Sequence, residues 1–196
     1  MQYNGALTRE QFMFQEMRIA ARLMWEGLSE AEIIDRVKDQ NLFQYPTERE
    51  AASKCRACLK RLACIQDMPV IMDALIDGAY LEAKQAALIA MMCQNRLMAE
   101  FMVQVIGHKY RTLDLTVTAK DFHMFFQDLA AQDETVASWT DSTIAKIKSV
   151  IRKCLKEAEF ISGEQLLPVY LSPDFVQALK SAGHRDFLCA FNVLDE

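Results

Sequence analysis

The stretch Ser29–Leu62, SEAEIIDRVKDQNLFQYPTEREAASKCRACLKRL, contains two helix starts in succession and decides the fold. Ser29 is followed three residues later by Glu32, and Thr47 is followed in the same way by Glu50. A hydroxyl residue with an acid three positions on is a capping box, in which the two side chains satisfy backbone amides at the start of a helix. The pattern therefore predicts two consecutive helices, one from each box.

Outside that stretch, apolar residues recur at helical spacing along the chain. A helix is expected over Arg9–Glu26, which gives residues 1–66 three helices in helix-turn-helix order. Residues 67–196 would then form a larger helical bundle, or the whole of 1–196 one continuous domain. Residues 80–106 are apolar on nearly every side, as in a buried helix, which Gly107 would end. Further helices are expected from Pro69 to about Gly78, from Thr118 to about Gln132, from Thr140 or Ser142 to about Phe160, from Pro173 onward, and over His184–Leu194.

The composition favours an all-α fold and a soluble protein. Only 6 Gly and 4 Pro occur in 196 residues, which is fewer turn residues than a sandwich or barrel needs. The most apolar run, Ala86–Cys93, is far shorter than the roughly 20 residues of a membrane-spanning helix. The N-terminal residues show no basic segment followed by an apolar one, so no secretory signal is expected. We therefore expect a cytoplasmic protein without membrane contact, with its six Cys reduced.

The charges are segregated along the chain. Segments 49–61 and 141–156 each contain five bases and one acid, so each has a net charge of +4. Because the whole chain carries −5, the residues outside these two segments carry −13. A protein with such an uneven distribution binds its partners through local patches, so a negative total does not exclude nucleic acid.

Both basic segments have the pattern of an amphipathic helix. At about 100° per residue, Arg49, Arg56 and Lys60 fall on one side of the first segment, opposite apolar residues. The second segment repeats this arrangement. The candidate DNA-binding residues are the ten bases of the two segments: Arg49, Lys54, Arg56, Lys60 and Arg61 in the first, and Lys146, Lys148, Arg152, Lys153 and Lys156 in the second.

Two other interpretations of these helices stay open. A basic helix face is commonly a solvated surface, and the acidic remainder of the chain would suit a scaffold that binds other proteins. RNA is also possible in place of DNA, because phosphate contacts alone distinguish the two poorly. The sequence does not say whether the two helices lie side by side.

Catalytic and metal-binding patterns are missing from the sequence. The six Gly are isolated, so there is no Gly-rich phosphate loop. Cys55 and Cys58 have the spacing of a metal-binding pair, but no second pair of ligands follows. Both fall on the apolar side of their helix and are expected in the core. We therefore predict no enzyme activity, no catalytic residues, no metal and no cofactor.

Several stretches in the same order along the chain resemble the A-protein (BrxA) family of bacteriophage exclusion (BREX) systems. They are Tyr3–Leu7 (YNGAL), Arg22–Ser29 (RLMWEGLS), Asn41–Tyr45 (NLFQY), Cys58–Leu62 (CLKRL), Asp121–Phe126 (DFHMFF), Trp139–Lys156, and Leu171–Pro173 (LSP). The similarity covers about residues 1–175 and weakens in the last twenty.

The resemblance implies a cytoplasmic component of a phage-defence locus, acting beside a methyltransferase, an ATPase and an alkaline-phosphatase-like protein. It implies an all-helical fold like that of the antitermination factor NusB, and binding to double-stranded DNA. No catalytic or base-contacting residues transfer from the family to this sequence. We thus expect a non-enzymatic DNA-binding accessory subunit, with a protein-interaction scaffold as the alternative.

Overall fold

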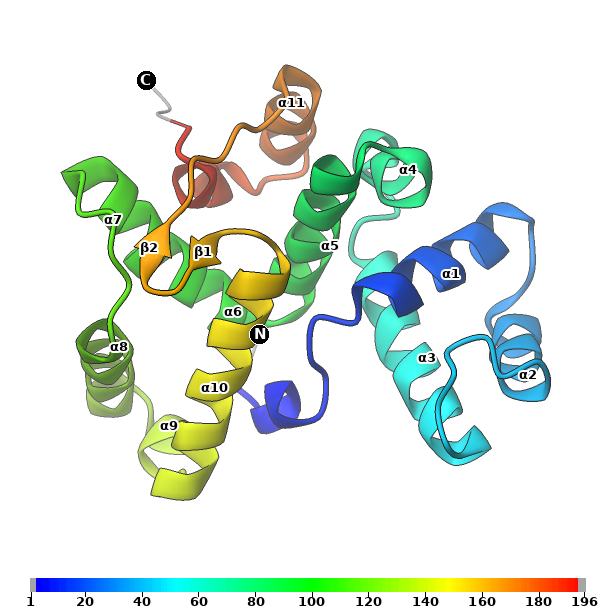
Figure 1. Cartoon of the computed structure of the whole chain (residues 1–196), viewed down its shortest axis with the longest axis horizontal. Coiled ribbons are helices and arrows are strands. Elements are labelled where there is room, and N and C mark those ends of the chain that lie inside the picture. The colour runs from blue at the N-terminus through cyan, green and yellow to red at the C-terminus, as the bar shows by residue number, and fades with distance from the viewer. Residues whose placement is uncertain (1–2, 194–196) are drawn as a thin grey trace. The chain divides into compact units, whose positions relative to one another are not determined.

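The structure is a computed structural model that describes residues 3–193, and most of these residues lie in helices (Figure 1). Within those residues, the one sheet is an antiparallel hairpin of β1 (Ile161–Ser162) and β2 (Gln165–Leu166). The predicted all-α fold is confirmed, while the likeness to NusB stays a prediction. The described residues form two compact units, Phe12–Gln94 and a second that combines residues 3–11 with 95–193.

The unit Phe12–Gln94 starts its second and third helices where the two capping boxes predicted them. The Glu32 carboxylate accepts from the Ser29 amide at 2.8 Å, and the Thr47 hydroxyl accepts from the Glu50 amide at 3.2 Å. The last helix of the unit is buried on nearly all sides, as expected of a central helix. The helices are α1 (Phe14–Trp25), α2 (Glu30–Asp39), α3 (Glu48–Ala63), α4 (Pro69–Asp77) and α5 (Tyr80–Gln94).

The first helix begins later than the sequence suggested. A short 3-10 helix, η1 (Gly5–Thr8), is followed by Met13 in the left-handed region at φ 52°, and α1 starts only at Phe14. The start predicted at Arg9 was therefore wrong. A fully buried arginine of α3, Arg61, donates to the Phe12 carbonyl at 2.8 Å, which fixes the chain in this non-helical turn.

The second unit contains the remaining elements. Residues 3–11 belong to it because the Tyr3 hydroxyl donates to Glu100 and the Arg96 guanidinium lies 4.1 Å from the centre of the Tyr3 ring. Its later elements are α6 (Arg96–Glu100), a π-helix η2 (Phe101–Ile106), α7 (Gly107–Thr112), α8 (Ala119–Gln132), α9 (Glu134–Ala137), α10 (Asp141–Glu157), the β1–β2 hairpin, α11 (Pro173–Ser181) and a 3-10 helix η3 (Arg185–Phe191). The predicted helix His184–Leu194 is thus a 3-10 helix, and its last residue lies outside the described residues.

The long helix predicted over residues 80–106 is interrupted at Asn95. This residue has extended backbone angles (φ −123°, ψ 107°), and its side chain accepts from the Met98 amide at 3.1 Å, so it caps a new helix. Gly107 does not end that helix, because α7 continues through it to Thr112. The interruption coincides with the boundary between the two compact units.

The division expected after residue 66 falls inside the unit Phe12–Gln94, where α4 packs against α1 and α5. A boundary between independently folding domains at that point stays a prediction. None of the helices described for residues 3–193 is both long and apolar enough to cross a membrane.

Candidate nucleic-acid interface

The α3 helix has one core face and one cationic face. On its apolar side, Cys55, Cys58 and Leu62 are completely buried. Arg49, Arg56 and Lys60 are exposed, and Lys54 is partly buried. The helix is held at its start by the Thr47 cap and along its length by packing on α1 and α2. Three cations therefore reach solvent along one side of a helix whose other side is fixed in the core.

Arg61 does not belong to that cationic face. Its side chain has no solvent exposure, and its guanidinium donates to the Phe12 carbonyl. It therefore cannot reach a phosphate in this structure, although the sequence placed it among the ten candidate bases. A helical wheel already puts Arg61 about 120° from Arg49, at the border of the core face, and that angle was the signal for its burial.

The five bases of α10 divide into two groups. Lys146, Lys153 and Lys156 are exposed on the side opposite the buried stripe of the helix. Lys148 and Arg152 are partly buried instead, and both lie over phenyl rings of α8. The Lys148 ammonium lies 5.4 Å from the centre of the Phe126 ring, and the Arg152 guanidinium lies 5.1 Å from that of Phe122.

These ring contacts keep charge at the surface while using the aliphatic stems for packing. A cation over an aromatic face is attracted by the ring quadrupole, and its side chain loses rotational freedom in the contact. Lys153 is also positioned, because its ammonium donates to the Gln11 amide oxygen at 2.7 Å and lies 3.6 Å from the Glu157 carboxylate. That exposed ion pair is weak, so the Lys153 charge remains available to an anion.

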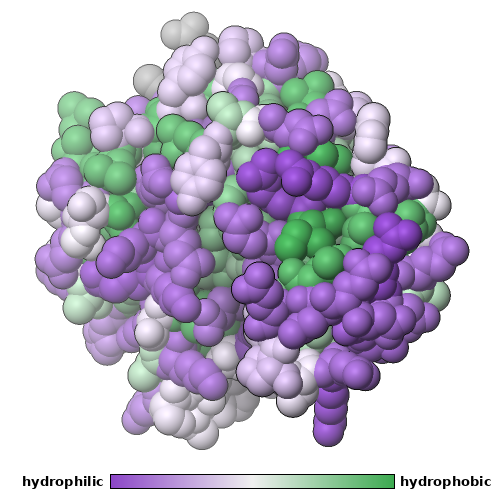
Figure 2. Space-filling view, turned by 45° about the vertical axis from the view of Figure 1, so that its right-hand side comes forward, coloured by the Kyte–Doolittle hydropathy of each residue, from purple (hydrophilic) through white to green (hydrophobic). Residues whose placement is uncertain are grey.

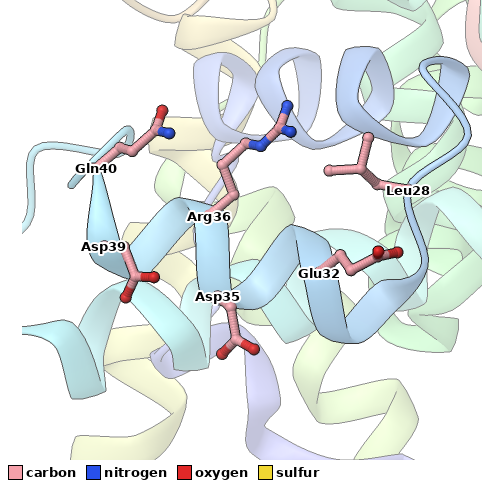
Figure 3. Close-up of a pocket in the computed structure, with 6 residues that line it drawn as sticks. All are labelled: Leu28, Glu32, Asp35, Arg36, Asp39 and Gln40. Atoms are coloured by element: carbon pink, nitrogen blue, oxygen red, sulfur yellow. The ribbon is translucent and has the colours of Figure 1, made fainter.

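Four acids of the unit Phe12–Gln94 lie on α2, whereas α3 carries acids only in its first turn, at Glu48 and Glu50. Figure 3 shows α2, where Glu32, Asp35 and Asp39 line a shallow pocket and Arg36 extends toward α1. Arg36 pairs with Glu26 at 3.1 Å. Phosphates would be repelled by this acidic helix, so a nucleic acid that binds the unit would be expected to approach the α3 side.

The described residues do not form an obvious reaction centre. No group of three or more His, Cys, Asp or Glu among residues 3–193 could hold a metal ion. Burial raises the pKa of the Cys55 thiol to about 11, so the thiol stays protonated at neutral pH. The pair at positions 55 and 58 is fully buried on the core face of α3, as its helical position predicted.

The fold and the two basic helices define a class, an all-α protein that presents cations on two otherwise buried helices. The chain belongs to the BrxA family, whose sequence model matches residues 1–183. The resemblance seen in the sequence is thereby confirmed.

Two relatives and one solved structure extend this comparison. The chain is 28% identical over 185 residues to the BREX protein BrxA of Bacillus cereus (strain H3081.97), covering 92% of each protein. It is 22% identical over 187 residues to the BREX protein BrxA of Escherichia coli O9:H4 (strain HS), covering 94% of this chain and 87% of the relative. A crystal structure of an uncharacterized protein from Magnetospirillum magneticum is 20% identical, with a TM-score of 0.80 over 98% of this chain and 100% of the other. This last likeness shows the fold alone.

Proposed function

We propose that this BrxA-family protein is a non-enzymatic, cytoplasmic accessory subunit of a BREX phage-defence complex that binds double-stranded DNA. The observation that carries the proposal is the placement of bases on α3 and α10. On both helices, exposed cations lie opposite a fully buried stripe, in a chain whose net charge is −5. A chain selected only for solubility would not need its bases to be concentrated on two helices.

The contacts would be mainly to phosphates. Arg49, Arg56 and Lys60 supply the α3 contribution. Lys146, Lys153 and Lys156 supply that of α10, with Lys148 and Arg152 adding fixed charge beside them. Phosphate contacts fix a protein on the duplex but carry little sequence information, so choice of site would rest with another subunit such as the methyltransferase.

The first prediction is that DNA binding is electrostatic and uses both helices. Neutralising about four to six phosphates gives a slope of about −4 to −5 for log affinity against log salt concentration. The double variants Arg56→Glu with Lys60→Glu, and Lys153→Glu with Lys156→Glu, should each weaken binding to unrelated duplexes by similar factors. Fluorescence anisotropy with labelled duplexes over a salt series measures both effects.

The controls are charge reversals at Lys120 and Lys180, which are exposed and lie outside both basic segments. They should change the affinity much less. Lys84 is unsuitable as a control because it is buried. Loss of binding to one sequence only would indicate base readout, and stronger binding to an RNA duplex of the same sequence would reassign the ligand.

The alternative is a protein-interaction scaffold for the methyltransferase, the ATPase and the alkaline-phosphatase-like protein without DNA contact. The acidic face of α2 favours such a role, since it suits a basic protein surface rather than nucleic acid. If both double reversals bind DNA as the parent does at low salt, α3 and α10 are solvated faces and the scaffold explains the protein better.

A further inference from the structure

An apolar hollow lies between α1 and α4, within the unit Phe12–Gln94. It has a volume of about 250 Å³ and is lined mainly by Met24, Trp25, Pro69, Met72, Asp73 and Ile76. Trp25 is 73% exposed, which is unusual for the largest apolar side chain. We call this feature the α1–α4 hollow. Figure 2 shows that hydrophobic surface is uncovered on one face of the molecule and bordered by hydrophilic residues.

The walls of the α1–α4 hollow are locked together by two arginines of α1. Arg18 donates to the carbonyls of Leu75 and Ile76 at 3.1 and 2.9 Å, and Arg22 donates to the Ile76 carbonyl at 3.2 Å. These carbonyls end α4 and would otherwise lack helical partners. Because the two helices are held at fixed spacing, a ligand that enters the hollow would not have to order its walls first.

The rim of the α1–α4 hollow is acidic. Asp73 belongs to the lining, Asp67 and Asp77 directly follow the lining residues Gln66 and Ile76 in the chain, and all three acids are exposed. Arg22 pairs with Asp77 at 3.3 Å. In the described part of the chain, Asp67 and Asp73 take part in no ion pair. Two carboxylates thus remain beside an apolar surface, which favours a cationic partner and disfavours a phosphate backbone.

We propose that the α1–α4 hollow is a docking site for a segment of another protein subunit. That segment inserts one aromatic or aliphatic side chain next to Trp25 and carries a Lys or Arg that pairs with Asp73 or Asp67. Tryptophan is strongly enriched among residues that dominate protein interfaces, and methionines such as Met24 and Met72 adapt to the shape of an inserted group. The site does not depend on DNA binding by α3 and α10.

The first experiment measures retention of the methyltransferase, the ATPase and the alkaline-phosphatase-like protein of the same locus, each co-expressed with the full chain. Trp25→Ser should weaken retention of one of them by about thirty-fold or more, the effect of losing a dominant interface residue. Asp67→Lys with Asp73→Lys should weaken it by about ten-fold, because the rim then repels the partner's cation. Thermal unfolding and DNA affinity of these variants should match the parent.

Matched controls come from the other unit. Tyr170 is an aromatic residue exposed to a similar degree, at 74%, and Asp128 and Asp174 are exposed acids. Tyr170→Ser and the pair Asp128→Lys with Asp174→Lys should retain the same subunit as the parent does. Equal loss in the controls would overturn the proposal, since it would show a general surface effect.

A second readout follows Trp25 directly. The chain has only two Trp, so Trp139→Phe leaves Trp25 as the sole tryptophan. Its emission should shift to shorter wavelength when the retained subunit is added, because the indole is then removed from water. Unchanged emission in a formed complex would contradict docking at this site. So would a concentration-dependent dimer that Trp25→Ser dissociates, since the occupant would then be a second copy of this chain.

Discussion

A buried ammonium group near the start of α8 shows what single residues contribute to this fold. Lys109 is almost completely buried, and its ammonium lies 2.7 Å from the Asp114 carboxylate and 2.8 Å from that of Asp121. Burial alone would raise the pKa of Asp121, but hydrogen bonds from Lys109 and Thr118 outweigh it and hold that pKa below its usual value. The cluster ties α7 to the cap of α8.

The pH dependence of stability follows from this cluster. A carboxyl whose pKa is lowered in the folded state stabilises that state above its unfolded pKa of about 3.9, and the contribution is lost as the pH falls through the folded pKa. Lys109→Met should lower the free energy of unfolding by about 1 to 2 kcal/mol at pH 7, less than for a fully buried pair because the acids reach solvent. The deficit should shrink between pH 4 and pH 2.

Urea unfolding followed by circular dichroism over that pH range measures the effect. Lys120→Met, which removes an exposed lysine of α8, is the control and should change little at any pH. If the loss of stability in Lys109→Met is as large at pH 2 as at pH 7, it does not come from the ion pairs of Lys109 with Asp114 and Asp121.

Arg61 marks the limit of residue-level inference from the sequence. Its position in a run of bases favoured the surface, whereas its helical angle placed it at the border of the core face. The angle allowed burial but did not require it, and Arg61 is buried because it donates to the Phe12 carbonyl, a partner that only the tertiary structure brings near it. Arg49, Arg56 and Lys60, whose angles and charges agreed, are exposed as expected.

At the scale of elements, capping residues predicted helix starts well and long apolar runs predicted helix ends poorly. The starts at Ser29, Thr47 and Thr118 are all confirmed by capping contacts. The polar triplet Gln94-Asn95-Arg96 does interrupt the apolar pattern at this point, but Asn95 was missed as a cap because apolar residues at helical spacing resume directly after it. Its role depends on the Met98 amide, one turn ahead, which the side chain caps.

Gly107 gives the element-scale prediction. A glycine inside a helix normally costs up to about 1 kcal/mol relative to Ala, so Gly→Ala should stabilise. Here the added Cβ would lie 2.5 Å from the Cys189 Sγ and 3.2 Å from that residue's carbonyl carbon. Gly107→Ala should therefore lower the free energy of unfolding by about 1 to 3 kcal/mol.

A double-variant cycle tests the cause of that loss. Cys189→Ala should recover part of it when combined with Gly107→Ala, because the closest atom is removed. Gly5→Ala is the matched control, since nothing lies within 4 Å of the position its Cβ would take. If Gly107→Ala instead raises the free energy of unfolding, η3 has moved to make room for the added methyl group and the predicted clash is wrong.

For the whole molecule, the sequence indicated the fold class and the family, while the grouping of the helices required the structure. Segregated charge and capping boxes are local features that a linear sequence displays. The compact units are not local, because residues 3–11 pack with elements that follow residue 95. No pattern near Tyr3 or Gln11 indicates the distant partners Glu100 and Lys153.

Because residues 3–11 pack with elements that come later in the chain, they should fold after the unit Phe12–Gln94 during synthesis on the ribosome. Synthesis delivers residues 3–11 first, yet the helices they contact emerge only after the whole of Phe12–Gln94 has been made. Domains generally fold as units as they emerge during synthesis. The unit Phe12–Gln94 should therefore become protease-resistant first, and η1 should become protected only after α10 has been synthesised. Limited proteolysis of stalled nascent chains should show residues 1–11 still cleavable when 12–94 is protected, and simultaneous protection would refute this order.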